Sequence, residues 1–189
     1  MTYLDYYIVP DSINPLNEDK AVQVLRTSLS EIEWLKYCLL MTFRYPDKDG
    51  LEFPAYYPKN NGRNHRIITP DNKVDSLAFF SLEDNLEINS VSGQPNKYRL
   101  SFICWFNQSR VAPAINEDIT NALMNEIISK FKSFGCEDFI KETKLAQIFD
   151  YSGLELKKVF QLGNEFKAFK ITFSCYQSDC QVPFISYEN

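Results

Sequence analysis

Glycine and histidine are scarce in this 189-residue chain, which has six glycines and one histidine. No G-x-G-x-x-G or Walker A motif occurs, so a doubly wound nucleotide-binding fold is not expected. The G-x-S-x-G and H-E-x-x-H motifs are also missing, and a Ser or Cys triad would have to use His65 as its base. That histidine lies in a turn-rich basic segment, where a loop histidine without a catalytic role is expected. We therefore expect no catalytic or cofactor-binding residues and no enzyme activity.

The chain also lacks cysteine and histidine residues at the spacing of metal ligands, and it has no long apolar run. The five cysteines form no C-x-x-C pair and have only one histidine to join them, so no metal site is expected. We interpret them as small buried residues in a reducing compartment. The most apolar stretch, Trp34–Phe43, is interrupted by Lys36 and is far shorter than the ~20 residues that span a bilayer. Since the N-terminal sequence also lacks a targeting pattern, we expect a protein of the cytoplasm, without membrane contact.

Basic residues are outnumbered, with 20 Lys and Arg against 25 Asp and Glu, which gives a formal charge of -5. A dedicated nucleic-acid binder is usually basic, so duplex binding is not expected. Aromatic residues, by contrast, make up 15% of the chain, and this abundance favours a sheet with a packed face. The length fits a single domain over residues 1–189.

The first half of the chain divides into a helix and a long irregular stretch. Apolar residues at helical spacing, among them Ala21, Leu25 and Leu29, predict a long amphipathic helix over 18–42. Turn-forming residues then crowd residues 44–75, which we interpret as a loop excursion in the form of a loose hairpin. Its expected extended pieces are Leu51–Tyr57 and His65–Ile68.

The second half alternates strands and helices. Strands are predicted over 76–107, followed by a helix over 116–134 that is capped by Asn116 and ended by Gly135. A shorter helix is predicted within 136–148. Strands follow over 154–176, including a strand pair up to Leu162, and a C-terminal arm covers 178–189. This order predicts an α+β fold, a mixed and mostly antiparallel sheet with two main helices on one face. The helix stripe of Ile119, Leu123, Ile127 and Phe131 should pack on Leu100, Phe102, Ile171 and Phe173.

The order of elements from Tyr98 to Tyr176 carries a resemblance to a known family. The strand YRLSFICWFNQSRV is followed by APAINEDITNALMNEIISKF, then by DYSGLELKKVF and the closing strand FKAFKITFSCYQ. With the helix before it, this order resembles the tail-terminator and tail-completion proteins of tailed bacteriophages, of the lambda tail-terminator type. The segment 44–73 and the tail after Tyr176 are longer than that family leads one to expect.

The resemblance implies a structural virion protein at the junction of neck and tail, assembled in the cytoplasm of the bacterial host. Such proteins form rings, commonly hexameric, that contact tail-tube and neck proteins. DNA would pass through the lumen without sequence-specific contact, and a negative charge would repel its phosphates. Alternatives are another neck, adaptor or contractile-injection-system ring component, a cytoplasmic helix-on-sheet module that binds a peptide or small molecule, and an enzyme with a dispersed site.

Subunit contacts are expected in the excursion and in the C-terminal arm. Both are turn-rich and carry large aromatic residues that an isolated monomer would leave partly exposed. The excursion also carries a basic run, which we expect to meet acidic groups of an adjacent subunit. The alternatives are a solvated loop and a surface that faces DNA passing nearby. The candidate contact residues are Phe53, Tyr56, Tyr57, Lys59, Arg63, Arg66, Phe184 and Tyr187.

Overall fold

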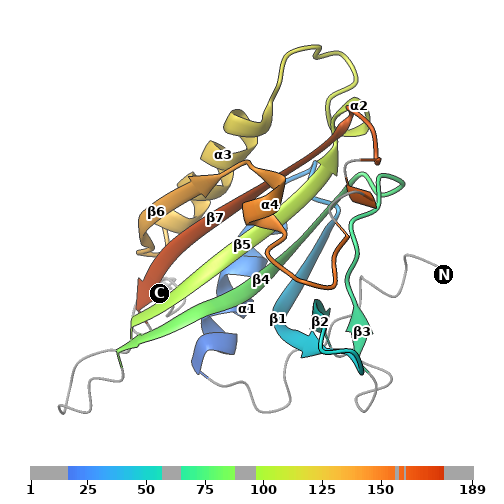
Figure 1. Cartoon of the computed structure of the whole chain (residues 1–189). Helices are drawn as coiled ribbons and strands as arrows, with labels where there is room; N and C mark the ends of the chain where they lie inside the picture. Colours follow the sequence, from blue (N-terminus) through green and yellow to red (C-terminus); the bar gives the residue numbers. More distant parts are fainter. Residues whose placement is uncertain (1–16, 57–64, 88–96, 156–157, 160, 177–189) are drawn as a thin grey trace, which may run out of the picture.

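A computed structural model describes residues 17–56, 65–87, 97–155, 158–159 and 161–176. Seven strands form one sheet in the order β3-β2-β1-β4-β5-β7-β6, and only the β1–β4 pair is parallel (Figure 1). This confirms the predicted α+β class with a mixed, mostly antiparallel sheet. The strands are β1 Tyr37–Pro46, β2 Glu52–Tyr56, β3 Arg66–Ile67, β4 Ser76–Glu87, β5 Lys97–Asn107, β6 Glu137–Glu142 and β7 Phe166–Tyr176. The helices are α1 Asn17–Leu29, α2 Gln108–Val111, α3 Thr120–Lys132 and α4 Leu145–Ile148.

The two long helices, α1 and α3, cover one face of the sheet (Figure 1). Phe131 of α3 is fully buried, and its ring centroid lies 4.7 Å from that of Phe173, 5.6 Å from Phe102 and 6.0 Å from Phe80. These rings belong to β7, β5 and β4, so one helical residue joins three strands. The expected packing of the α3 stripe on β5 and β7 is confirmed, because its buried members share one core cluster with the strand residues.

The ends of α3 are stabilised in two ways. The predicted cap Asn116 is wrong, because the helix begins after Ile119 and the Asp118 carboxylate instead accepts a 2.9 Å hydrogen bond from the Thr120 N–H. At the other end Gly135, which was predicted to end the helix, has a left-handed conformation with φ +75°. The N–H groups of Gly135 and Cys136 bond back to the carbonyls of Lys132 and Phe131, which closes the helix in a Schellman arrangement.

The predicted helix over 18–42 is too long, since α1 ends at Leu29 and β1 begins at Tyr37. Between them Ile32 and Leu35 lie in tight turns, yet their side chains are buried in the same core as α1. These two residues therefore continue the helical spacing of apolar residues without being helical. From Tyr37 the side chains belong to a sheet, where Leu39 joins the core of the opposite face.

The described residues of the predicted excursion, 44–56 and 65–75, include most of a hairpin and a short edge strand. β1 and β2 pair antiparallel around a turn in which Gly50 has φ +76°, and β2 pairs with β3 through Ala55 and Ile67. The predicted extended pieces correspond to β2 and β3. The remaining partner is β1, whose residues 37–42 the sequence pattern assigned to the helix.

The second face of the sheet is covered by the segment between β6 and β7. The predicted strand pair up to Leu162 is wrong, since the described residues of 149–165 form turns and a short helical piece, and strand begins only at Phe166. The 136–148 region holds the edge strand β6 before the short helix α4 (Figure 1). The covering residues pack on Phe79, Ile103 and Trp105 and bury Ile148, Phe149, Tyr151, Leu154 and Val159. This segment needs no strand pairing, because burial of its side chains, and not a ladder of backbone hydrogen bonds, holds it against the sheet.

Candidate functional site

Arg44 connects the β1–β2 hairpin to the segment between β6 and β7 that covers the second face of the sheet, which we call the covering segment. It extends from β1 over the Tyr151 ring, with its guanidinium carbon 4.7 Å from the ring centroid. Its Nη1 donates 2.9 Å hydrogen bonds to Glu52 Oε2 and to the carbonyl of Asp150. Cation, aromatic ring and carboxylate thus come from three segments that are separate in the sequence.

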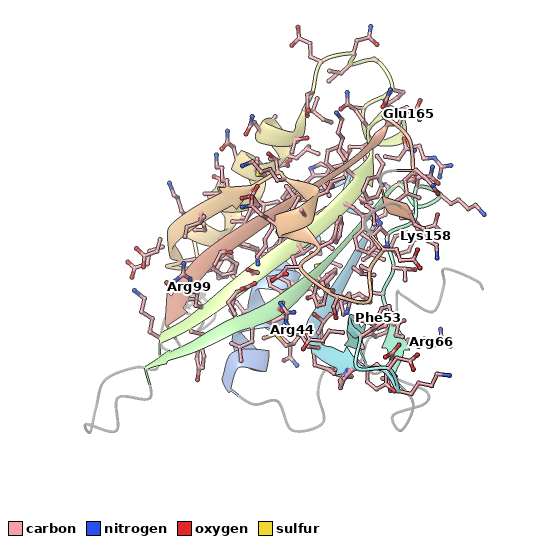
Figure 2. The ribbon with its side chains drawn as sticks, viewed as in Figure 1. Arg44, Phe53, Arg66, Arg99, Lys158 and Glu165 are labelled. Carbon is pink, nitrogen blue, oxygen red and sulfur yellow. The ribbon has the colours of Figure 1, made fainter. Side chains whose placement is uncertain are left out.

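A second set of contacts lies beside Arg44. The N–H of Glu52 donates to Ser152 Oγ, and its carbonyl accepts from the N–H of Gly153, both at 2.8 Å. The Phe53 ring occupies the space where a side chain on Gly153 would lie, only 2.3 Å from an ideal Cβ position. Figure 2 shows Arg44, Phe53 and Arg66 following one another toward the β3 edge. We call Arg44, Glu52, Phe53 and residues 150–153 the hairpin anchor.

The expected contact residues divide into three groups. Tyr56 is only 2% exposed, so the prediction that it stays partly exposed in a monomer is wrong: its ring packs in the core of the second face. Phe53 is half-buried in the hairpin anchor, and Arg66 lies half-buried on the edge strand β3. The others lie outside the described residues: Tyr57, Lys59, Arg63, Phe184 and Tyr187.

His65 lies against an aromatic ring. Its ring centroid is 3.6 Å from that of Tyr45, and Phe43 lies edge-on at 6.3 Å. Both aromatic residues belong to β1. The histidine therefore packs against aromatic side chains of β1, the first strand of the β1–β2 hairpin.

Exposed aliphatic side chains mark surfaces that the sequence analysis did not single out. Ile67 on β3 is 36% exposed and Ile140 on β6 is 52% exposed, and these strands are the two opposite edges of the sheet. Leu51 in the hairpin turn and Ile115 in the loop before α3 are exposed as well. The available signal for Ile140 was an isoleucine beside Phe139, with charged residues on both sides of the pair in Glu137–Glu142.

A hollow of about 560 Å³ lies where β1 and β4 begin and α2 follows β5. We call it the Trp34 hollow; it is lined by Glu31, Glu33, Trp34, Lys36, Asp75, Arg110, Val111 and Glu126. The Trp34 indole Nε1 donates a 2.7 Å hydrogen bond to Glu126 Oε2 on α3. Four of the eight lining residues are acidic and two are basic. Glu31 pairs with Lys130 on α3 and Asp75 pairs with Arg110, so the excess of acid at the hollow comes from Glu33 and Glu126.

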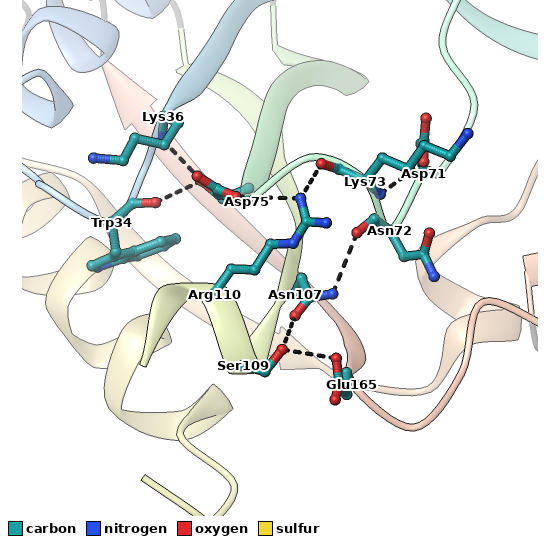
Figure 3. Close-up of polar contacts among 11 residues, drawn as sticks. Trp34, Lys36, Asp71, Asn72, Lys73, Asp75, Asn107, Ser109, Arg110 and Glu165 are labelled. Atoms are coloured by element: carbon teal, nitrogen blue, oxygen red, sulfur yellow. Dashed lines mark hydrogen bonds and ion pairs between the residues drawn. The ribbon is translucent and has the colours of Figure 1, made fainter. Parts of the chain in front are cut away.

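Hydrogen bonds between loops hold the rim of the Trp34 hollow (Figure 3). Ser76 Oγ donates to the carbonyl of Trp34 at 2.6 Å and accepts from the N–H of Lys36 at 2.8 Å. Arg110 reaches from α2 to the Asp75 carboxylate, 3.5 Å away, and donates to the carbonyl of Lys73 (Figure 3). The segments before β1, before β4 and after β5 are thereby joined at one rim.

Burial changes the chemistry of two cysteine thiols. Burial raises the pKa of the Cys38 thiol to about 12, and burial likewise raises the pKa of Cys104. Reactive thiolates need the opposite shift. Among the residues described, no group of three or more His, Cys, Asp or Glu side chains could hold a metal ion. No described helix has the length and apolarity that crossing a bilayer needs.

An ion pair joins the second face of the sheet across three strands. Lys170 Nζ on β7 lies 2.6 Å from Glu83 Oε1 on β4, and the two side chains are 16% and 29% exposed. Burial by itself would raise the pKa of Glu83. Hydrogen bonds from Lys170 and Ser101, with the charge of Lys170, outweigh burial and hold that pKa below its ordinary value.

We expect Lys170→Met to destabilise the protein at pH 7 by about 1–3 kcal/mol, because it leaves the partly buried Glu83 carboxylate without its cation. A lowered carboxyl pKa contributes stability above the unfolded-state value of about 4.3, and the contribution is lost as pH falls through the folded-state pKa. Denaturant unfolding at pH 7 and pH 3 should therefore show a difference between variant and wild type that shrinks in acid.

The matched control for this pair is Lys158→Met, which removes a cation whose side chain is 72% exposed. It should change the free energy of unfolding by less than about 0.5 kcal/mol at either pH. A loss in Lys170→Met that is equal at both pH values would contradict the role assigned to Glu83.

No family model matches the chain, and a search of curated proteins finds no match. The features that bear on the function are the exposed aliphatic residues at both sheet edges, the hairpin anchor and the acidic Trp34 hollow.

Proposed function

We propose that the protein is the subunit of a head-to-tail ring in the neck or tail of a tailed phage, as a tail terminator or tail-completion protein. The main support for a ring is that the exposed side chains Ile67 and Ile140 lie on opposite edges of the sheet. A ring made of identical subunits needs two different contact surfaces on each subunit, and a rotation that closes. Exposed aliphatic residues at two separate edges supply such surfaces.

The order of elements supports the place of the ring in a virion. Helix α1 leads into the sheet, and β5 ends at the polar residue Asn107, followed by the short helix α2 and then the central helix α3. The aromatic strand β7 then closes the helix-covered sheet. This is the order on which the resemblance to tail-terminator proteins rests, except that the single strand β6 replaces the expected strand pair. A net charge of -5 suits a ring that conducts DNA without retaining it.

Sedimentation velocity over a range of concentrations, with electron microscopy of the largest species, tests the ring. We expect a concentration-dependent oligomer that appears as closed annuli. Ile140→Asp should raise the concentration at which rings form at least tenfold while the thermal melt of the monomer stays unchanged. A chain that remains monomeric to about 1 mM, or that stops at a two-fold dimer, would overturn the ring.

A further inference from the structure

We propose that the Trp34 hollow receives the basic segment around Lys59, Arg63 and Arg66 of a neighbouring copy of this chain. This inference rests on the proposed ring and names one of its contacts. The hollow and the segment lie on different parts of the chain, so such a contact is heterologous and can continue from subunit to subunit.

The hollow has the chemistry of a site for a cationic side chain. Glu33 has no hydrogen-bond or ion-pair partner among the described residues, and it is exposed at the rim. Glu126 is held against the indole of Trp34 by their hydrogen bond, so an aromatic ring and a carboxylate line the same space. An ammonium or guanidinium group gains from both, through ion pairing and through attraction to the aromatic ring.

The occupant follows from the distribution of charge along the chain. Residues 53–70 contain Lys59, Arg63 and Arg66 and no aspartate or glutamate, although the whole chain is acidic. Copies with a net charge of -5 repel one another, and a basic segment seated in an acidic hollow offsets that repulsion at the contact. The hollow and this segment are therefore complementary in charge.

Strand register argues that Arg66 binds a different copy and not its own hollow. β3 pairs with β2, and β2 with β1, so that Ile67 and Phe43 both lie opposite Ala55. Phe43 lies seven residues after Lys36 at the rim of the hollow, which is roughly 23 Å along the strand direction at about 3.3 Å per residue. That distance is greater than the reach of an arginine side chain.

A charge-swap experiment tests the contact. One variant carries Glu33→Lys with Glu126→Gln, which keeps an acceptor for the Trp34 indole; the other carries Arg63→Glu with Arg66→Glu. Each alone should raise the concentration needed for assembly at least tenfold at low salt, and by less at high salt, because exposed pairs are screened. An equimolar mixture of the two should assemble again, because each reversed segment then meets a hollow of opposite charge. A single chain carrying all four changes should assemble as well.

The matched control is Glu117→Lys with Glu155→Gln, which changes the net charge equally at exposed residues outside the hollow. It should assemble like the wild type. If the wild type forms no rings, the proposed function itself fails. If rings form and the two variants assemble normally, only the contact at the hollow fails, and reduced DNA retention by the Arg63 and Arg66 variant would then favour a DNA contact. Loss of assembly without recovery in the mixture would also overturn this contact.

Discussion

Phe131→Ala should destabilise the protein by about 3–5 kcal/mol, the range for removing a fully buried phenylalanine. Phe131 has 0% exposure, and its ring is central to a cluster that includes Phe80, Phe102 and Phe173. Truncation removes the aromatic contacts and leaves a cavity that three strands and a helix cannot all close at once. Denaturant unfolding, followed by the circular dichroism signal, measures this as a lower midpoint at unchanged slope.

Phe134→Ala provides the comparison, because Phe134 lies one turn later and is only partly buried against the same core. Its loss should be smaller by at least about 1 kcal/mol. Equal losses in the two variants would contradict the central position of Phe131, as would a loss below about 1 kcal/mol for Phe131→Ala.

Gly153→Ala should cost about 1–3 kcal/mol, the usual range for adding a methyl group where there is no room. The new Cβ would lie 2.3 Å from the Phe53 ring, so the ring must leave its position. Because Phe53 belongs to β2, this displacement should also loosen the β1–β2 hairpin from the covering segment. Hydrogen exchange should then show faster exchange at the N–H groups of Glu52 and Gly153, which are bonded across the hairpin anchor.

A double-mutant cycle with Phe53→Ala isolates the steric cause. Phe53→Ala alone removes a half-buried ring, but in that background Gly153→Ala should cost less than about 0.5 kcal/mol, since the clash is gone. An unchanged cost in the Phe53→Ala background would show that Gly153 is required for another reason.

Elements with strong local signals were predictable from the sequence. α3 has a regular apolar stripe and a glycine at the position where its chain turns, and β5 and β7 carry continuous apolar faces. The helix N-terminus was less predictable, because Asp118 bonds to the Thr120 N–H while the more typical cap, Asn116, lies in the loop. Capping residues are common near a helix start, and only the backbone path selects among them.

β1 and the segment after Tyr151 were not predictable from local pattern. Ile32 and Leu35 continue the spacing of α1 through turns, so the pattern could not mark the point where helix becomes strand. β1 gains its ladder from β4, which is more than 30 residues later in the sequence. The covering segment has the residue types of strands, yet it is held by side chains packed on Phe79 and Trp105.

The candidate contact surfaces combine both kinds of information. The acid-free basic segment over 53–70 is visible in the sequence alone. The Trp34 hollow is not, because its lining comes from the turns before β1, from Asp75, from α2 and from α3. Nor is the burial of Tyr56, which composition would place on the surface of a turn-rich loop.

The sequence by itself determined the α+β class, the strand character of β5 and β7, the apolar stripe of α3 and the separation of basic from acidic segments. These depend on periodicity and composition, which act over a few neighbouring residues. The tertiary structure alone decided that residues 37–46 pair as a strand, that Phe53 and Tyr56 pack inward, and that Ile67 and Ile140 occupy opposite edges. Those outcomes depend on contacts between residues far apart in the chain, where burial against a distant partner outweighs local preference.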